Sequence, residues 1–234
     1  MCGIVGLYLK NPALESQLGE LFSPMLIAMS ERGPDSAGFA IYGDEVNNDF
    51  IKLTLRHPNE CYDWEAVATS LKLHMDVAVD WFQNSNVSVF KIQASAAVAQ
   101  QFIDKHYPEI LILSAGQSIE ILKEVGLPEH IANTFNLKNM KGSHIIGHTR
   151  MATESAVTME GSHPFSTGMD LCLVHNGSLS NHNRLRQELK REGVKFETDN
   201  DSEVAAGYLT HRLQQGDSLN EALDNALKDL DGFF

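Results

Sequence analysis

Cysteine is scarce in this chain of 234 residues, which contains only Cys2, Cys61 and Cys172. Disulfide frameworks and cysteine-based zinc sites both need clustered thiols. Three scattered cysteines therefore argue against either one, and we expect no metal site. No shared disulfide or metal site therefore accounts for the three thiols, and the role of each cysteine is considered separately.

Positively charged residues are also few. The sequence has 18 Lys and Arg residues against 31 Asp and Glu residues, which gives a formal net charge of -13. A surface of that sign repels phosphate backbones and anionic lipids. We therefore expect no nucleic-acid partner and no binding to membrane surfaces.

Long hydrophobic runs are missing. No uninterrupted apolar stretch approaches the roughly 20 residues that span a bilayer. The first residues also lack the basic start and long apolar segment of a secretory signal. With 43% hydrophobic and 21% charged residues, the composition is typical of a soluble globular protein. We expect a cytoplasmic protein.

Apolar periodicity indicates a compact opening of strand, helix and strand. Residues 3–9 read as a short buried strand, and residues 39–42 as a second one. Between them, apolar residues recur at steps of three and four, as in an amphipathic helix. These are Leu14, Leu18, Leu21, Phe22, Met25, Leu26 and Met29.

Residues from about 44 to 141 differ from this opening, because apolar runs at 87–92 and 110–113 suggest further strands accompanied by helices. We interpret this region as an inserted α/β unit. Beyond it we expect strands at 143–147 and 169–174, and helices at 181–192 and 202–215. A last helix begins at Ser218, since Glu221 three residues later completes a capping box.

The chain ends on a turn signal, Asp231-Gly232, followed by Phe233 and Phe234. Two consecutive apolar residues after a turn are typical of the beginning of a buried strand. We expect the fold to be truncated at this C-terminal end.

Cys2 is the first candidate for chemistry. A small residue after Met1 normally permits removal of the methionine, which would place a thiol and a free α-amine on one residue. The reference pKa values of these two groups lie within about one unit of each other, so one can take a proton from the other near neutral pH. Alternatively, Cys2 is a small apolar residue that opens a strand.

Other polar residues lie where strands end. Arg150 closes an apolar run, so its guanidinium needs an acidic partner or an anionic ligand; a structural salt bridge explains it equally well. Asn176-Gly177 follows another apolar run, where the pair is an ordinary turn or a pair of oxyanion donors. Asp199, Asp201 and Glu203 precede a helix, and two of the three are expected to act only as caps.

Six short segments, taken in this order, resemble the class II glutamine amidotransferase domain, a member of the N-terminal nucleophile hydrolases. They are M-C-G-I-V-G at 1–6, R-G-P-D-S-A-G at 32–38, G-H-T-R at 147–150, S-H-P-F at 162–165, H-N-G at 175–177 and D-S-E at 201–203. The start of the chain and the long spacer before G-H-T-R look like the stand-alone amidotransferase subunit of glutamate synthase-like enzymes, including N-methylglutamate synthase.

The resemblance implies an α+β fold, a four-layer αββα sandwich over residues 1–234 that carries the inserted unit. It implies Cys2 as nucleophile, with Asn176 and the Gly177 N–H as the oxyanion hole. Arg150 would bind the glutamine α-carboxylate and Asp201 its α-ammonium, while Thr153 and Arg32 would line the site. A zwitterionic substrate needs one fixed cation and one fixed anion to orient its side-chain amide.

The implied reaction is hydrolysis of L-glutamine through a thioester on Cys2, giving glutamate and ammonia for synthase subunits of a hetero-oligomer. No cofactor is expected in this chain; FMN and iron-sulfur centres would belong to the partner subunits. Two alternatives stay open. One is a degenerate subunit that only binds glutamine or scaffolds a complex, and the other is a related amidase for amides that are not amino acids.

An electrophilic glutamine analogue should modify Cys2 rather than Cys61 or Cys172. Cys172 lies in an apolar run and Cys61 has no adjacent amine, so neither has a group to activate its thiol. Mass spectrometry of the labelled protein locates the adduct. Label on Cys61 or Cys172, with Cys2 untouched, would contradict the assignment of the nucleophile.

Overall fold

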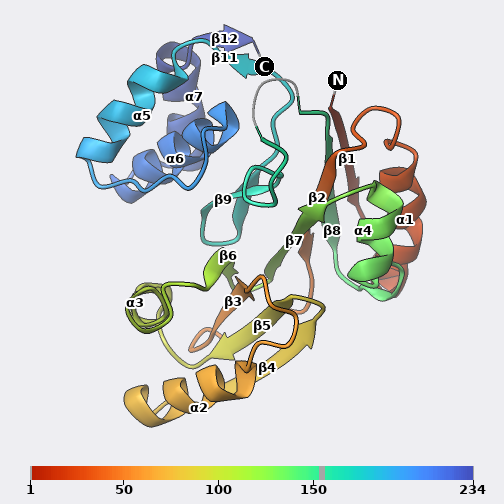
Figure 1. The fold of residues 1–234 in the computed structure, drawn as a ribbon, viewed down its shortest axis with the longest axis vertical. Coiled ribbons are helices and arrows are strands. Elements are labelled where there is room, and N and C mark those ends of the chain that lie inside the picture. Colours follow the sequence, from red (N-terminus) through yellow and green to blue (C-terminus); the bar gives the residue numbers. More distant parts are fainter. Residues whose placement is uncertain (1, 153–155, 234) are drawn as a thin grey trace.

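A four-stranded antiparallel sheet forms the centre of the molecule (Figure 1). The computed structural model of the chain describes residues 2–152 and 156–233. In this first sheet the strands lie in the order β1-β8-β2-β7. Their bounds are Gly3–Tyr8 for β1, His144–Arg150 for β8, Ser36–Tyr42 for β2 and Ile119–Val125 for β7.

Helices cover one face of this sheet (Figure 1). They are η1 (Pro12–Gln17), α1 (Leu18–Ile27), α4 (Pro128–Thr134) and η2 (Leu137–Asn139). The helix expected between the first two strands is thus a 3-10 segment followed by an α-helix, with Pro12 at the start of the 3-10 segment. Phe22, Leu26, Phe39 and Phe135 are fully buried between helices and sheet, which makes this layer the main hydrophobic core.

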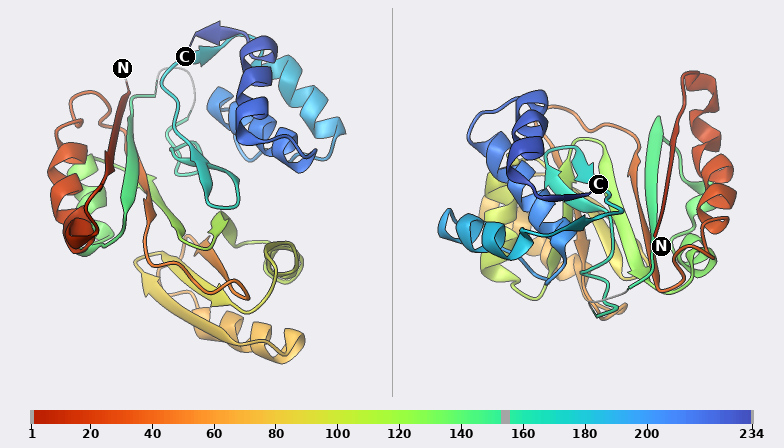
Figure 2. Two further views of the ribbon diagram at one scale, coloured as in Figure 1. Left: turned by 180° about the vertical axis from the view of Figure 1, so that it is seen from behind. Right: turned by 90° about the horizontal axis from the view of Figure 1, so that it is seen from above.

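A second antiparallel sheet, in the order β4-β5-β3-β6, lies at one end of the first (Figures 1 and 2). Its elements are β3 (Ile51–Arg56), α2 (Trp64–Met75), β4 (Val79–Asn84), β5 (Val87–Ile92), α3 (Ala96–His106) and β6 (Leu111–Gly116). It has a core of its own, in which Trp64, Leu53, Phe90 and Ile103 are buried.

This second sheet is smaller than the unit expected at 44–141. The segment after the apolar run at 110–113 is β7, which pairs with β2 in the first sheet along its whole length. The last residue of β2, Tyr42, lies opposite the first residue of β7, Ile119. The chain therefore leaves and re-enters the first sheet at one pair of neighbouring residues, so the second sheet replaces the turn of a hairpin.

Two ion pairs join the sheets. The Lys52 Nζ of β3 lies 3.0 Å from the Glu120 Oε1 of β7, and the Arg56 Nη2 lies 3.0 Å from the Glu124 Oε2. Lys52 is fully buried and also donates to the carbonyl of Asp44. A buried charge is tolerated only when it is paired and hydrogen-bonded, and Lys52 meets both conditions.

The last part of the chain lies against the uncovered face of the first sheet (Figure 2). It contains β9 (Phe165–Gly168), β10 (Leu171–Leu173), β11 (Ser178–Leu179), α5 (His182–Arg191), α6 (Asp201–Gln214), α7 (Leu219–Asp229) and β12 (Gly232–Phe233). Helix α6 contacts β9, α5 and α7. Helices, sheet, hairpin and helices thus follow one another in layers, and the expected α+β class is confirmed.

The strand expected at 169–174 is shorter than predicted. Asp170 has a φ of +53°, so the chain turns there, and only Leu171–Leu173 forms β10. The capping box at the start of α7 is present, because Ser218 and Glu221 bond each other's backbone N–H groups. Leu219, Leu223 and Leu227 of α7 are exposed, while Ala222 and Ala226 are buried. No helix among the described residues is long and apolar enough to cross a membrane.

Asp170 ties the β9–β10 hairpin to the turn between the two sheets. Its carboxylate accepts hydrogen bonds from the backbone N–H groups of Gln117, Ser118 and Ile119, at 2.7, 2.8 and 3.0 Å. Burial by itself would raise the pKa of Asp170, but these donors favour the ionised form more strongly, and the pKa is lowered. One carboxylate thus satisfies a turn that would otherwise leave three donors unpaired.

Replacing Asp170 by Asn should cost about 2 to 3 kcal/mol of unfolding free energy, because hydrogen bonds to a charged acceptor are lost while Asn still tolerates the positive φ. The Asp170 contribution is present above its ordinary pKa of 3.8 and is lost as the pH falls through the lower folded value. Urea titrations between pH 3 and pH 7 measure both effects. Exposed Asp224→Asn is the control; an equal change in both variants would contradict the assignment.

Candidate functional site

A cavity of about 770 Å³ lies where β1 begins and β8 ends. Gly3, the first residue of β1, pairs with Thr149 of β8, and this register sets Cys2 beside Arg150. Five of the seven residues expected at the site line the cavity. They are Cys2, Arg150, Asn176, Gly177 and Asp201.

The remaining two expected residues are Arg32 and Thr153. Arg32 does not line the cavity, but its Nε donates to the carbonyl of Cys2 at 3.3 Å. Thr153 lies outside the described residues, as does Met1.

The backbone of Cys2 is held by two donors. The Asn176 Nδ2 donates to the Cys2 carbonyl at 3.1 Å, beside the bond from Arg32. The Sγ of Cys2 lies 3.8 Å from the carbonyl of Met151. An amide NH₂ carries two hydrogens, so Asn176 can bond Cys2 and still offer a second donor.

Arg150 lies at the end of β8 and is almost fully buried, with 5% of its surface exposed. Its Nη1 donates to the carbonyl of Ala156 at 3.1 Å, and the same atom lies close to Gly161. A guanidinium presents its donors in a rigid fork, which suits a carboxylate ligand in the cavity.

Asp201 is the first residue of α6, and its Oδ2 accepts the N–H of Leu179 at 2.8 Å. Of the three carboxylates expected near this helix, none is the cap. The N-cap is Asn200, whose side chain accepts the N–H of Ser202 at 2.9 Å. Asn caps a helix as well as Asp does. The sequence therefore contained a signal for this cap, Asn200, which our interpretation of the three carboxylates missed.

The neighbouring carboxylates divide as follows. Glu203 accepts bonds from the backbone N–H groups of Glu197 and Thr198 and from the Thr198 hydroxyl. It therefore holds the loop in front of α6. Asp199 is exposed and lines the cavity. Asp201 thus supplies a carboxylate at a helix N-terminus inside the cavity that Arg150 also lines.

Three histidines lie together at the cavity, where His163 and His175 are part of the lining and His148 lies behind them. His148 of β8 is fully buried, and its ring centroid lies 4.1 Å from that of His163. The Nε2 of His148 lies 3.1 Å from the carbonyl of His175. Burial lowers the pKa of His148 to about 4, lowers that of His163 well below its ordinary value and lowers that of His175. The three rings are therefore neutral at pH 7.

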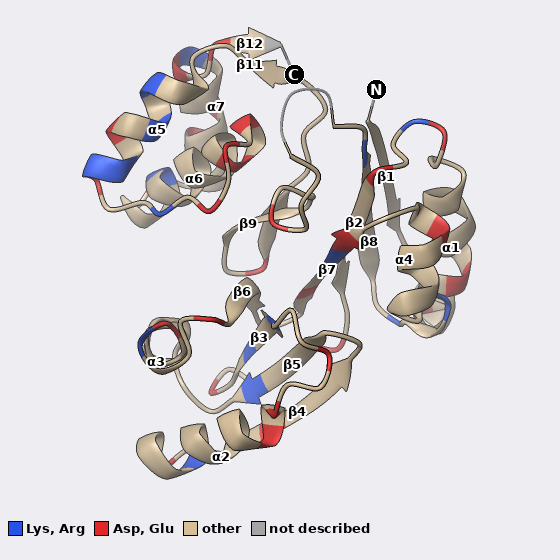
Figure 3. Ribbon diagram, in the orientation of Figure 1, with Lys and Arg blue, Asp and Glu red and all other residues tan. Residues whose placement is uncertain are grey.

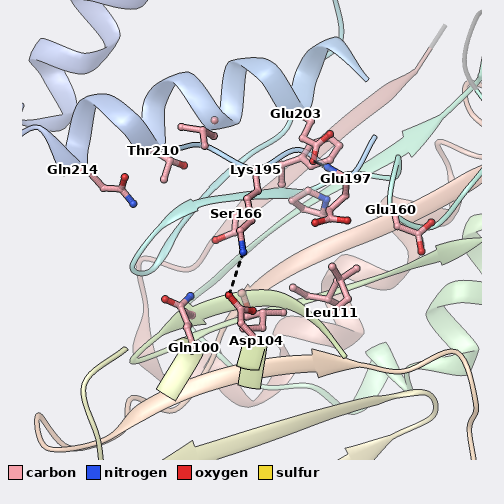
Figure 4. Close-up of a pocket in the computed structure, with 18 of the residues that line it drawn as sticks. Gln100, Asp104, Leu111, Glu160, Ser166, Lys195, Glu197, Glu203, Thr210 and Gln214 are labelled. Carbon is pink, nitrogen blue, oxygen red and sulfur yellow. Dashed lines mark hydrogen bonds and ion pairs between the residues drawn. The ribbon is translucent and has the colours of Figure 1, made fainter. Parts of the chain in front are cut away.

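A second cavity, of about 510 Å³, lies between α3 and α6 (Figure 4). Buried Lys123 lines it and donates to the carbonyls of Ser162 and Glu160, at 2.6 and 3.2 Å. At its exposed edge, the Lys195 Nζ lies 3.9 Å from the Asp104 Oδ2. None of the expected site residues lines this cavity, so the candidate site is the larger one.

Lys and Arg residues recur along α5, and Asp201 and Glu203 lie in the first turn of α6 (Figure 3). Among the described residues, no three His, Cys, Asp or Glu side chains are arranged as a group that could hold a metal ion. The larger cavity presents a thiol, a guanidinium, a side-chain amide and carboxylate groups.

Comparison with known proteins agrees with this geometry. The family described as "Glutamine amidotransferase domain" matches residues 148–234. The chain is 52% identical over 234 residues to "Glutamine amidotransferase-like protein GlxB" of Rhizobium meliloti (strain 1021), covering all of this chain and 77% of that protein. It is 30% identical over 125 residues to the glutamine–fructose-6-phosphate aminotransferase (isomerizing) of Idiomarina loihiensis, covering 53% of this chain and 20% of that enzyme.

A solved structure supports the fold. The glutamine phosphoribosylpyrophosphate amidotransferase of B. subtilis superposes with a TM-score of 0.52 at 20% identity, covering 99% of this chain and 33% of that chain. The expected N-terminal nucleophile hydrolase fold is thereby confirmed. The chain belongs to the class II glutamine amidotransferase family.

Proposed function

We propose that the chain hydrolyses the side-chain amide of L-glutamine, with Cys2 as the nucleophile and ammonia as the product. The observation that carries this proposal is the convergence of Cys2, Arg150, Asn176 and Asp201 on one cavity. These residues come from four separate segments of the chain, and their groups match what the reaction needs.

The proposed substrate position follows from charge. Arg150 would bind the α-carboxylate through two parallel hydrogen bonds, and Asp201 would bind the α-ammonium. An amino acid held at both ends of its zwitterion can extend its side-chain amide toward Cys2. Arg32 would keep the Cys2 backbone in place through its bond to the Cys2 carbonyl. Thr153 remains a proposed lining residue that lies outside the described residues.

In the proposed reaction, the Cys2 thiol transfers its proton to the free α-amine and the sulfur attacks the amide carbon. The carbonyl oxygen becomes an oxyanion, for which Asn176 and the Gly177 N–H are the proposed donors. The C–N bond then breaks, and the nitrogen takes the proton and leaves as ammonia. Water hydrolyses the remaining glutamyl thioester, releasing glutamate and restoring the thiol.

We further propose that the ammonia serves synthase subunits of a glutamate synthase-like or N-methylglutamate synthase complex in the cytoplasm. This part rests on the resemblance of the chain's first residues and long spacer to such subunits. In that assembly the chain itself would carry no cofactor, and FMN and iron-sulfur centres would belong to the partners.

The function is tested by measuring glutamate release from glutamine by protein whose Met1 has been removed, with Cys2→Ala as the inactive comparison. Glutamine hydrolysis that depends on Cys2 is the expected result. A folded, processed protein that binds glutamine without releasing glutamate would favour a purely glutamine-binding subunit.

Replacing Arg150 by Lys should raise the KM for glutamine strongly. An ammonium is a point charge and cannot reproduce two parallel bonds to a carboxylate. Asp201→Asn should act in the same direction through the α-ammonium. Steady-state kinetics over a wide range of glutamine concentrations measures both, and an unchanged KM in both variants would refute the proposed substrate position.

Replacing Asn176 by Ala should lower kcat roughly 100- to 1000-fold with little change in KM, because an oxyanion donor acts mainly as charge develops. If Asn176 were only a turn residue, the same change would alter stability by about 1 kcal/mol and leave the chemical step intact. Asn176→Gly separates the two interpretations, since glycine suits a turn but supplies no amide. Recovery of activity in the glycine variant would favour the turn.

A further inference from the structure

We infer that His148 and Ser202 are positioning residues, which hold the segment 175–177 so that Asn176 faces Cys2. This inference rests on the proposed function and adds two residues to it. Neither side chain was assigned a role by the sequence, although each lies within a motif quoted above. Both act on the segment from its buried side.

Asn176 cannot hold its own position. The residue is exposed, and its side-chain amide bonds only the Cys2 carbonyl among the hydrogen bonds of the described residues. An exposed Asn side chain has several rotamers, so a fixed direction has to come from the backbone that carries it. That backbone is the peptide group between His175 and Asn176.

His148 fixes this peptide group. Its Nε2 lies 3.1 Å from the carbonyl oxygen of His175, and a carbonyl oxygen can only accept. The hydrogen of the neutral imidazole is therefore on Nε2, and the tautomer follows from the structure. His148 is fully buried against His163, so its ring has no room to turn away.

Ser202 fixes the other side of the same residue. Its Oγ lies 2.8 Å from the Nδ1 of His175 and 3.3 Å from the Oδ1 of Asp201. A carboxylate can only accept, so the Ser202 hydroxyl donates its hydrogen to Asp201. The same hydroxyl oxygen then accepts the hydrogen bond from the Nδ1–H of His175. The segment that carries the proposed oxyanion donor is thus bonded to the carboxylate proposed to bind the substrate ammonium.

The consequence is preorganisation. A donor that has to be aimed during the reaction is worth less than one that is already aimed, and small misplacements of reacting groups cost about 100-fold in rate. Removing either hydrogen bond leaves every substrate-contacting group present but lets the segment 175–177 move. Asp201 keeps the hydrogen bond from the Leu179 N–H when Ser202 is replaced, so the expected loss falls on kcat, with KM nearly unchanged.

The test compares variants that keep or lose the hydrogen-bonding group. His148→Phe keeps a ring but loses the donor, whereas His148→Gln retains an N–H near the position of Nε2. Ser202→Ala loses the hydroxyl, and Ser202→Thr keeps it. We expect kcat for glutamate release to fall about 10- to 100-fold in the Phe and Ala variants with KM within about threefold, and to recover substantially in the Gln and Thr variants.

A matched control removes a buried serine bond elsewhere. Ser88 is fully buried in the second sheet and donates to the carbonyl of Phe82 at 3.0 Å. Ser88→Ala should lower the thermal midpoint and leave kcat unchanged. If kcat fell in Ser88→Ala as well, in proportion to the loss of thermal stability in all the variants, the inference would be overturned.

Hydrogen exchange at the amides of Asn176 and Gly177 gives a readout that does not depend on glutamate release. Exchange should be faster in His148→Phe and Ser202→Ala than in the parent protein. If the parent releases no glutamate, the proposed function fails, while faster exchange in these variants would still support the positioning role. An active parent with unchanged kcat in folded His148→Phe and Ser202→Ala, or equal losses in the Phe and Gln variants, would overturn that role. If His148→Phe does not fold, Ser202→Ala decides.

Discussion

The antiparallel register of β1, β8 and β2 is the constraint on which the rest of the site depends. Because Gly3 pairs with Thr149, and Ser36 pairs with Arg150, the starts of β1 and β2 and the end of β8 lie side by side at one end of the sheet. A slip of one residue would send every side chain of a strand to the opposite face. Phe39 of β2 is buried in the same core as Phe22 and Leu26 of α1, and a slip of β2 would take Phe39 out of that core.

The turn at residues 32–35 depends on the same register. Asp35 bonds both the end of β8 and the segment after it: its N–H donates to the Arg150 carbonyl at 3.1 Å, and its Oδ2 accepts from the Ala152 N–H at 2.8 Å. Arg32, three residues earlier, reaches the carbonyl of Cys2. The side chains in front of the cavity are thus supported by backbone that belongs to a well-packed sheet. This is how a small set of polar groups keeps its relative positions.

The buried histidines and the second sheet are both accommodated without disturbing the end of the first sheet that carries the cavity. Neutral rings at His148 and His163 fill the space between sheet and loop, where a charged residue would be costly without a partner. The second sheet grows from the hairpin between β2 and β7, at the end of the first sheet away from the chain's N-terminus (Figure 1). An insertion at a turn disturbs neither the register nor the cavity.

The sequence by itself determined the apolar strands, the amphipathic helices and, through six short motifs, the family and five residues that line one cavity. It could not determine how far the inserted unit extends, because β7 and the strands of the second sheet carry similar apolar patterns and only pairing tells them apart. Nor could it assign His148, Ser202 or Asn200, whose partners lie far along the chain or on a neighbouring loop. Only the tertiary structure decided these, since a hydrogen bond depends on distance in space and not on residue type.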